Sequence, residues 1–348
     1  MEFLAGGRAE VRITRADVGK RVSVRRLTGG GAGEGAFTDV VGVLTSWDEG
    51  VLSITRRSGE CVGIEESSLV AAKVVPAEPA RRKGPAATAR ELQQVAARGW
   101  PALETERLGE WTLRASGGFT RRANSVLPLG DPGVPLDAAL ERIVQWYGER
   151  GLPPVIVVAT GRADTGDELA AQLAERGWTD ERHTTVRISA LAPLADTAAD
   201  TPPGSAGGAP TPVALTREPG ADWLALYNRT GETGGPTADA LKVLTGGPSV
   251  WFATVRGAGG STAAIGRLVV DGRWAGFSAI EVDPAERRQG LATLVMAALA
   301  ERALDEGASA AYLQVETDNA GALALYDRLG FTDHHGYHYR RPLPGGRR

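Results

Sequence analysis

The sequence has little of several things that mark special classes of protein. It contains one cysteine, Cys61, in 348 residues, which excludes an internal disulfide framework and a zinc site built from several cysteines. The net charge of −3 at pH 7 gives no whole-chain argument for binding nucleic acid or membranes. No run of about 18 apolar residues occurs, and residues 1–15 contain no apolar signal-peptide core. We therefore expect a soluble, cytoplasmic protein.

What is present is typical of a folded protein with several domains. Hydrophobic residues make up 42% of the sequence and charged residues 23%, which excludes wholesale disorder. At roughly 150 residues per domain, the length predicts two or three domains. Two stretches rich in proline, alanine and glycine, 76–88 and 191–211, lack apolar periodicity and are predicted linkers. They divide the chain into segments 1–75, 89–190 and 212–343.

Segment 1–75 has the pattern of a small β-barrel. Turn residues separate short β-prone runs, which predict strands at 11–13, 21–24, 40–44, 51–55 and 61–64. Five strands in this length predict an SH3-like or Sm-like barrel, with 29–35 as a flexible loop. Acidic residues offset its arginines, so no basic face for nucleic acid is indicated. We expect it either to bind a protein or peptide partner or to be a purely structural cap.

The other two segments share one order of elements. In the middle segment the periodicity predicts helices at 89–99, 136–150 and 167–176 and strands at 111–115, 124–129 and 155–160. In the third segment it predicts strands at 277–282 and 311–317 and helices at 291–304 and 320–329. Residues 155–180 and 311–333 both read strand, polar turn, helix and then Gly-aromatic-Thr-Asp. This favours an internal repeat over a coincidental likeness of two αβ units.

The strongest chemical signal is EVDPAERRQGLATL, residues 281–294. A predicted strand ends at Val282, and a helix begins after Arg287, Arg288 and Gly290. The first amides of a helix lack backbone partners and carry partial positive charge, and a glycine there lets a ligand approach the backbone. The segment indicates a site for a phosphate-rich ligand, with a plain turn carrying solvated arginines as the alternative. It matches neither a P-loop nor the dinucleotide fingerprint.

Together with VETDNAGALALYDRLGF (315–331), this segment resembles the GNAT superfamily of acetyltransferases. Arg287-x-x-Gly290-x-Ala292 after a strand is similar to the family's pyrophosphate-binding motif. Asn319, Tyr326 and the following Leu-Gly-Phe are similar to its later strand–helix signature. The resemblance, which covers about 277–331, implies an N-acetyltransferase that uses acetyl-CoA as cosubstrate, without a metal. Acetyl-CoA would bind between the strands 277–282 and 311–317.

The resemblance implies an α+β or α/β fold, in which the small barrel is followed by two GNAT-like units, each a mixed sheet flanked by helices. It also implies roles for single residues. Val282 would pair its backbone with the pantetheine arm or the acetyl carbonyl, and Asn319 would contact the CoA arm unless it only caps its helix. Tyr326 would protonate the departing thiolate unless it is simply a core aromatic. The pyrophosphate would be held by Arg287, Arg288, Gln289, Gly290, Leu291, Ala292 and Thr293.

The pattern does not fix the general base. Tyr312, Gln314 and Glu316 share one face of a predicted strand. In the bacterial enzymes that acetylate ribosomal-protein N-termini, a glutamate occupies the position matching Gln314, and a glutamine cannot act as a base. Glu281, Glu316 or a chain of waters could replace it, and each glutamate could equally be a solvated strand residue. The missing glutamate also leaves open a non-catalytic acyl-CoA-binding sensor or adaptor.

The middle segment lacks the motif. Residues 129–140 contain no Arg-x-x-Gly-x-Ala, and Leu173 stands where the repeat places Tyr326. The resemblance therefore implies a degenerate unit that binds no acetyl-CoA, as in tandem families such as mycothiol synthase. The three-part layout is similar to an actinobacterial GNAT group with an N-terminal SH3-like domain. The polar stretch 117–126, with Arg121 and Arg122, is interpreted as an exposed loop rather than part of a shared cleft.

The third segment ends in a histidine-rich stretch, HHGYHYR (334–340). Without nearby cysteines or obvious acidic partners, its histidines do not indicate a metal site. By resemblance it forms the last hairpin of the fold, where Tyr337 or His338 could touch the substrate. The acceptor remains open among protein lysines, protein N-termini and small-molecule amines.

Overall fold

The structure, a computed structural model, describes residues 11–28, 36–56, 60–75, 85–197, 212–227, 237–257 and 259–343. The chain divides into two compact units, Met1–Lys83 and Gly84–Arg348. The predicted loop at 29–35 and most of both predicted linkers lie outside the described residues. No helix in the described ranges is long and apolar enough to cross a membrane.

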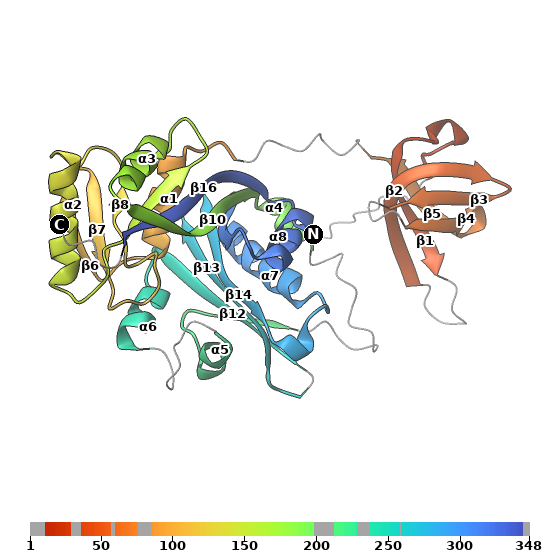
Figure 1. The fold of residues 1–348 in the computed structure, drawn as a ribbon. Helices are drawn as coiled ribbons and strands as arrows, with labels where there is room; N and C mark the ends of the chain where they lie inside the picture. The colour runs from red at the N-terminus through yellow and green to blue at the C-terminus, as the bar shows by residue number, and fades with distance from the viewer. Residues whose placement is uncertain are drawn as a thin grey trace, which may run out of the picture. The chain divides into compact units, whose positions relative to one another are not determined.

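The first unit is an antiparallel sheet in the order β4-β3-β2-β1-β5 (Figure 1). Inward residues such as Leu44, Ile54 and Ile64 are fully buried in its core. The predicted strand at 11–13 is wrong, because Val11 makes only an isolated bridge to Ala72. The fifth strand is instead β5, whose alanines and lysine gave no β signal. The strands are β1 (Arg21–Thr28), β2 (Ala36–Asp48), β3 (Val51–Thr55), β4 (Cys61–Glu65) and β5 (Leu69–Val74), and the short helices are η1 (Arg15–Asp17) and η2 (Glu66–Ser68).

The second unit is built on one sheet in the order β11-β12-β13-β14-β15-β10-β16-β9. Its neighbours are antiparallel except for β14 and β15, which run parallel. Its strands are β9 (Ile156–Thr160), β10 (Trp178–Ala190), β11 (Val213–Thr216), β12 (Ser249–Arg256), β13 (Thr262–Asp271), β14 (Trp274–Val282), β15 (Ala310–Glu316) and β16 (Thr332–Pro342). A second, smaller sheet contains β6 (Glu104–Leu108), β7 (Trp111–Ala115) and β8 (Leu127–Pro128).

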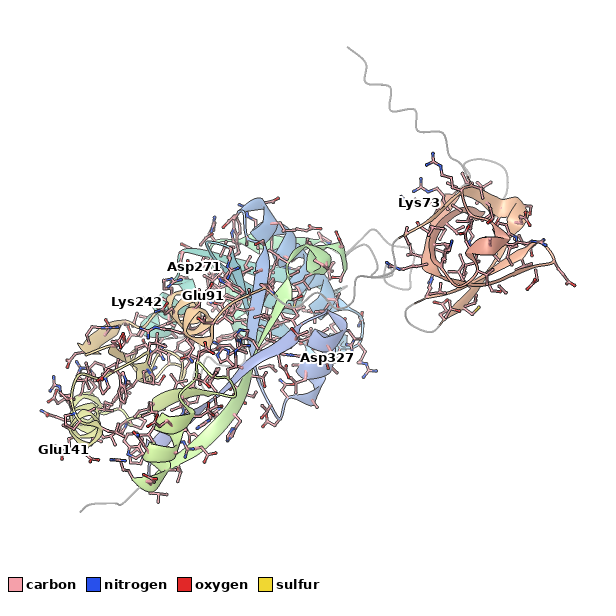
Figure 2. All side chains as sticks on the ribbon, turned by 90° about the horizontal axis from the view of Figure 1, so that it is seen from above. Lys73, Glu91, Glu141, Lys242, Asp271 and Asp327 are labelled. Carbon is pink, nitrogen blue, oxygen red and sulfur yellow. The ribbon has the colours of Figure 1, made fainter. Side chains whose placement is uncertain are left out.

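Helices cover both faces of the large sheet. On one face of the sheet, the hydrophobic core contains side chains of α1 (Ala89–Gly99), α5 (Ala221–Leu226) and α6 (Ala238–Thr245). On the other face, the core contains side chains of α4 (Ala192–Ala195), α7 (Leu291–Asp305) and α8 (Ala320–Arg328). Figure 2 labels Glu91 on α1 and Asp327 on α8. The helices α2 (Leu136–Gly148) and α3 (Asp167–Glu175) share a core with β7 and β9, and η4 (Pro284–Glu286) precedes α7.

Two predicted boundaries need correction. The second linker does not begin at 191, because Leu191 and Leu194 are fully buried against α7. These two side chains bring α4 into the core despite the proline- and alanine-rich composition. The predicted strand 124–129 is reduced to β8, because the Asn124 side chain donates to the Phe119 and Thr120 carbonyls and holds the chain in a turn.

The two repeated segments exchange strands. β10 ends the middle segment, yet it lies between β15 and β16 of the third segment, and β16 pairs in turn with β9. Figure 1 shows β10, in green, beside β16, in dark blue. The β10–β16 pair is nearly symmetric, with Asp180 opposite Arg340 and Arg187 opposite Asp333. These residues correspond in the repeat, and they form ion pairs of 3.7 Å and 2.6 Å. The segments 89–190 and 212–343 are therefore joined in one sheet, and the boundary between them stays a prediction.

Candidate active site

β14 and β15 pair only over their first residues, from Trp274 opposite Ala310 to Phe277 opposite Leu313. Beyond Phe277 the strands part. A β-bulge accompanies this parting, because Ala279 has a positive φ of 52° and the register with β13 shifts. On the side that faces β15, the backbone of 278–282 therefore has no strand partner and is available to a ligand.

A cleft of about 1310 Å³ opens at this point. It brings together most of the predicted site residues, from β14, the 287–290 turn, α7, β15 and α8. Gln289 is the exception, because it does not line the cleft and its side chain donates to Glu286 Oε2 at 2.9 Å. The predicted residues that line it are Glu281, Val282, Arg287, Arg288, Gly290, Leu291, Ala292, Thr293, Glu316, Asn319 and Tyr326.

The N-terminus of α7 is arranged to receive an anion. Gly290 is its N-cap, with a left-handed φ of 79° that glycine adopts at little cost. No side chain caps the helix, and its first turn has no acidic residue. The first helical bond runs from Leu294 N to Gly290 O, so the preceding amides remain for a ligand. With Arg287 and Arg288 exposed beside them, these amides fit a pyrophosphate.

Tyr326 is both a core aromatic and a wall of the cleft. Only 9% of its surface is exposed, and its ring packs edge-on against Phe331 with centroids 5.8 Å apart. Burial raises the pKa of its phenol to about 12. The hydroxyl therefore stays protonated at neutral pH, as a proton donor requires.

Asn319 caps α8, because its Oδ1 accepts a hydrogen bond from the Ala322 amide at 3.1 Å. It also lines the cleft, so capping does not exclude contact with a ligand. Glu281 lies on β14 and Glu316 on β15, and both line the cleft. Glu316 Oε1 lies 3.3 Å from Arg182 Nη1.

The interpretation of 117–126 as an exposed loop is wrong, because Arg121, Arg122 and Asn124 line the same cleft. Asn124 is 8% exposed, and its Oδ1 accepts from the Ser116 and Gly118 amides, which folds the loop inward. Arg122 donates to Gln314 Oε1 at 3.0 Å. The only sequence signal was the density of polar residues after Gly117-Gly118.

Two further lining residues, Trp100 and Tyr227, were not predicted. Trp100 follows α1, and its ring centroid lies 4.7 Å from the Arg122 guanidinium. Nothing in the local sequence pattern distinguishes either aromatic from an ordinary core residue. Whether an aromatic side chain reaches the cleft depends on the long-range packing of α1 and α5 against β13.

Of the two C-terminal candidates, Tyr337 faces the cleft and His338 does not. The Tyr337 hydroxyl donates to Gln314 Oε1 at 3.2 Å. His338 lies on the opposite face of β16, with its ring 5.2 Å from that of His183. Within the described ranges, no cluster of three or more His, Cys, Asp or Glu side chains could hold a metal ion.

Comparisons with known proteins agree with this geometry. Residues 86–340 match the family model of the C-terminal region of the probable histone acetyltransferase Rv0428c, and residues 16–73 match that of its N-terminal Sm-like domain. The probable histone acetyltransferase Rv0428c of Mycobacterium tuberculosis is 29% identical over 92% of this chain and 94% of its own. The uncharacterized N-acetyltransferase YobR of Bacillus subtilis is 28% identical over 72% of this chain and 97% of its own.

A solved GCN5-related N-acetyltransferase from Kribbella flavida shares the fold, with a TM-score of 0.53 and 17% identity, over 74% of this chain and 96% of that one. The predicted small barrel is confirmed as an Sm-like domain. The named relatives are acetyltransferases, which favours an enzyme over a sensor or adaptor. The chain belongs to the Rv0428c-like family of GNAT N-acetyltransferases, with an N-terminal Sm-like domain.

Proposed function

We propose that the second unit transfers the acetyl group of acetyl-CoA directly to an amine, in the cleft where β14 and β15 part. The observation that carries this proposal is the meeting of an uncapped helix N-terminus and a protonated tyrosine on one cleft. The amides at the start of α7 would hold the pyrophosphate, together with Arg287 and Arg288. The backbone of β14 near Val282, which has no strand partner on the β15 side, would hold the pantetheine arm.

Proton movements follow from the side chains present. When the amine nitrogen bonds to the thioester carbonyl carbon and the C–S bond breaks, the amine loses a proton and the thiolate gains one. Tyr326 would donate the second proton. Glu281 and Glu316, the predicted carboxylates that line the cleft, would receive the first directly or through water.

Titration of the full chain with acetyl-CoA, followed by CoA release with a panel of amines, peptides and basic proteins, tests this function. We expect one acetyl-CoA per chain, because the middle segment has no equivalent turn, and CoA release that depends on the amine. A stoichiometry of two would show that the middle segment also binds acetyl-CoA. Binding without CoA release from any amine would instead establish a sensor.

A further inference from the structure

A small pocket of about 40 Å³ lies beside the inner end of the cleft, beneath α1. That volume exceeds the roughly 10–15 Å³ that one water molecule needs. Trp100, Arg122, Gln314 and Tyr337 line both the cleft and the pocket, so the two spaces are neighbours that share these side chains. Apolar side chains from α1 and β9, such as Leu92 and Val157, form part of the far wall.

Three arginines lie at or near this inner end without carboxylate partners: Arg114 and Arg122 line the small pocket, and the Arg267 guanidinium lies 4.6 Å from the Trp100 ring centroid. Arg114 is buried and donates only to Ser125 O and Oγ, at 2.8 Å and 2.9 Å. Arg267 is 1% exposed and donates to the carbonyls of Leu244, Gly99 and Gly246. Arg122 contacts Gln314 and Trp100. In the described part of the chain, none of the three forms an ion pair, and no acidic side chain lines the small pocket.

A buried charge is normally paired, because removing it from water costs several kcal/mol. Arg114 and Arg122, which line the pocket, and Arg267, which lies over the Trp100 ring, therefore give it a positive potential that an anion would neutralise. Arg114 and Arg267 are held by backbone and hydroxyl oxygens, whereas Arg122 lines the space with a planar, forked donor. Arg122 is thus the group placed to bind an anion directly.

Gln314 adds a second donor. Its Oε1 accepts hydrogen bonds from Arg122 and Tyr337, and an arginine can only donate, so this atom is the oxygen. The side-chain NH₂ group is left as a donor at the junction of the cleft and the pocket. Gln314 stands where the family resemblance leads us to expect a glutamate. Its side chain is suited to donating a hydrogen bond to an oxygen, not to removing a proton.

We propose that the acceptor is a small amine that also carries a carboxylate, and that Arg122 and Gln314 bind this carboxylate at the inner end of the cleft. The proposal rests on the acetyltransferase function proposed above. A guanidinium and a carboxylate match in shape and form paired charge-assisted hydrogen bonds. The amine of the same molecule would lie toward Glu281 and Glu316, whose charges favour an ammonium group. A lysine-rich peptide would instead bring positive charge toward the three arginines.

Calorimetry on the full chain, with CoA present so that no turnover occurs, tests this proposal. The probes are free α-, β- and γ-amino acids and the corresponding amides, which keep the amine and lose the carboxylate. We expect at least one acid to bind about tenfold or more tightly than its amide, the lower end for hydrogen bonds to a charged group. We also expect that acid to be acetylated in preference to its amide and to a lysine-rich peptide.

Variants test whether Arg122 causes the preference for an amino acid over its amide. In Arg122→Gln the acid should lose most of its advantage over the amide, whereas Arg122→Lys, which keeps the charge, should retain part of it. Arg142→Gln is the matched control, because Arg142 is an exposed arginine on α2 paired with Glu106 at 2.7 Å. Melting temperatures establish that each variant is folded.

The outcomes separate the two proposals. If the wild-type chain does not bind CoA, the proposed function fails and the acceptor proposal with it. If CoA binds but no acid binds more tightly than its amide, the acceptor proposal alone is overturned. The same holds if a lysine-rich peptide is preferred, or if folded Arg122→Gln discriminates between acid and amide as well as the wild type does.

Discussion

The helices α7 and α2 occupy corresponding places in the two repeated segments, but their first turns differ in charge. α7 begins at an uncapped left-handed glycine, after two exposed arginines, and has no acid in its first turn. α2 begins after Pro135 and carries Asp137 in its first turn, where the carboxylate accepts a hydrogen bond from Arg176 Nε at 2.6 Å. The positive end of α2 is thus already next to a negative charge, which would repel a phosphate.

The strands before these helices differ as well. β14 is long, bulged and parted from β15, whereas β8 has two residues and an isolated bridge is all that joins its neighbour Val126 to β9. Tyr326 lines the cleft, whereas its counterpart Leu173 is fully buried between helix and sheet. The comparison teaches that one order of elements can be kept while the features proposed to bind the ligand, at the strand, the turn and the second helix, are present in one segment and missing from the other.

The largest effect, on folding itself, is expected when the third segment is produced without the middle segment. A chain of residues 212–348 would lack β10, which pairs with both β15 and β16 and buries Val186 and Ile188. Each such side chain contributes about 1.5–3 kcal/mol by burial, so we expect no cooperative thermal transition. Co-expression with residues 84–197 should restore it. A folded, CoA-binding 212–348 chain would show that the exchanged strand is dispensable.

The next largest effect, on CoA affinity, is expected from changing Gly290, the left-handed glycine ahead of α7, and is compared with the same change at Gly133, a left-handed glycine ahead of α2. Gly290→Glu places a carboxylate where phosphate would bind, and like charges in contact cost several kcal/mol, so we expect CoA affinity to fall at least about 100-fold. Gly133→Glu ahead of α2 is the control, since φ is 75° at Gly133 and 79° at Gly290 and both variants carry the same backbone strain. Its CoA affinity should be unchanged by calorimetry. Equal losses would move the phosphate site away from α7.

Tyr326→Phe should lower turnover roughly 100- to 10,000-fold, with CoA affinity and melting temperature nearly unchanged, because the ring and its packing on Phe331 remain. Since burial raises the pKa of this phenol to about 12, the donor stays protonated through the working range. Its ionisation should therefore cause no fall in rate as pH rises to about 9. A fully active Phe variant would leave Tyr326 as a packing residue, like Leu173.

The smallest effect is expected from removing the Asn319 side chain, which tests whether it only caps α8 or also contacts the CoA arm. Asn319→Ala on α8 and Thr88→Ala on α1 each remove a side-chain cap, and each should lower the free energy of unfolding by about 1 kcal/mol in denaturant titrations. If Asn319 also contacts the CoA arm, its variant alone should weaken CoA binding. Identical CoA affinities in the two variants would limit Asn319 to its cap.

Local pattern predicted about half of the single elements of the second unit, such as the helix Ala89–Gly99 and the strand Trp111–Ala115, because apolar periodicity and helix-ending glycines are present in the sequence. It predicted none of the elements between residues 191 and 276, among them β12 and β13. It failed where one side chain overrode the composition. Leu191 and Leu194 bury the start of a predicted linker as a short helix, and Asn124 holds the start of a predicted strand in a turn, which leaves only β8.

The sequence by itself was enough for the resemblance to the GNAT family, because Arg287, Gly290 and Tyr326, which carry it, lie within one continuous strand–helix–strand–helix stretch. The roles that the resemblance gives them toward acetyl-CoA stay predictions. Only the tertiary structure decided that β10 and β16 are exchanged between the segments, since strand pairing across a long separation leaves no local signal. The same packing brings Arg122, from the middle segment, against Gln314 of the third. The inner end of the cleft, where we propose that the acceptor is selected, is therefore a property of contacts between residues far apart in the chain.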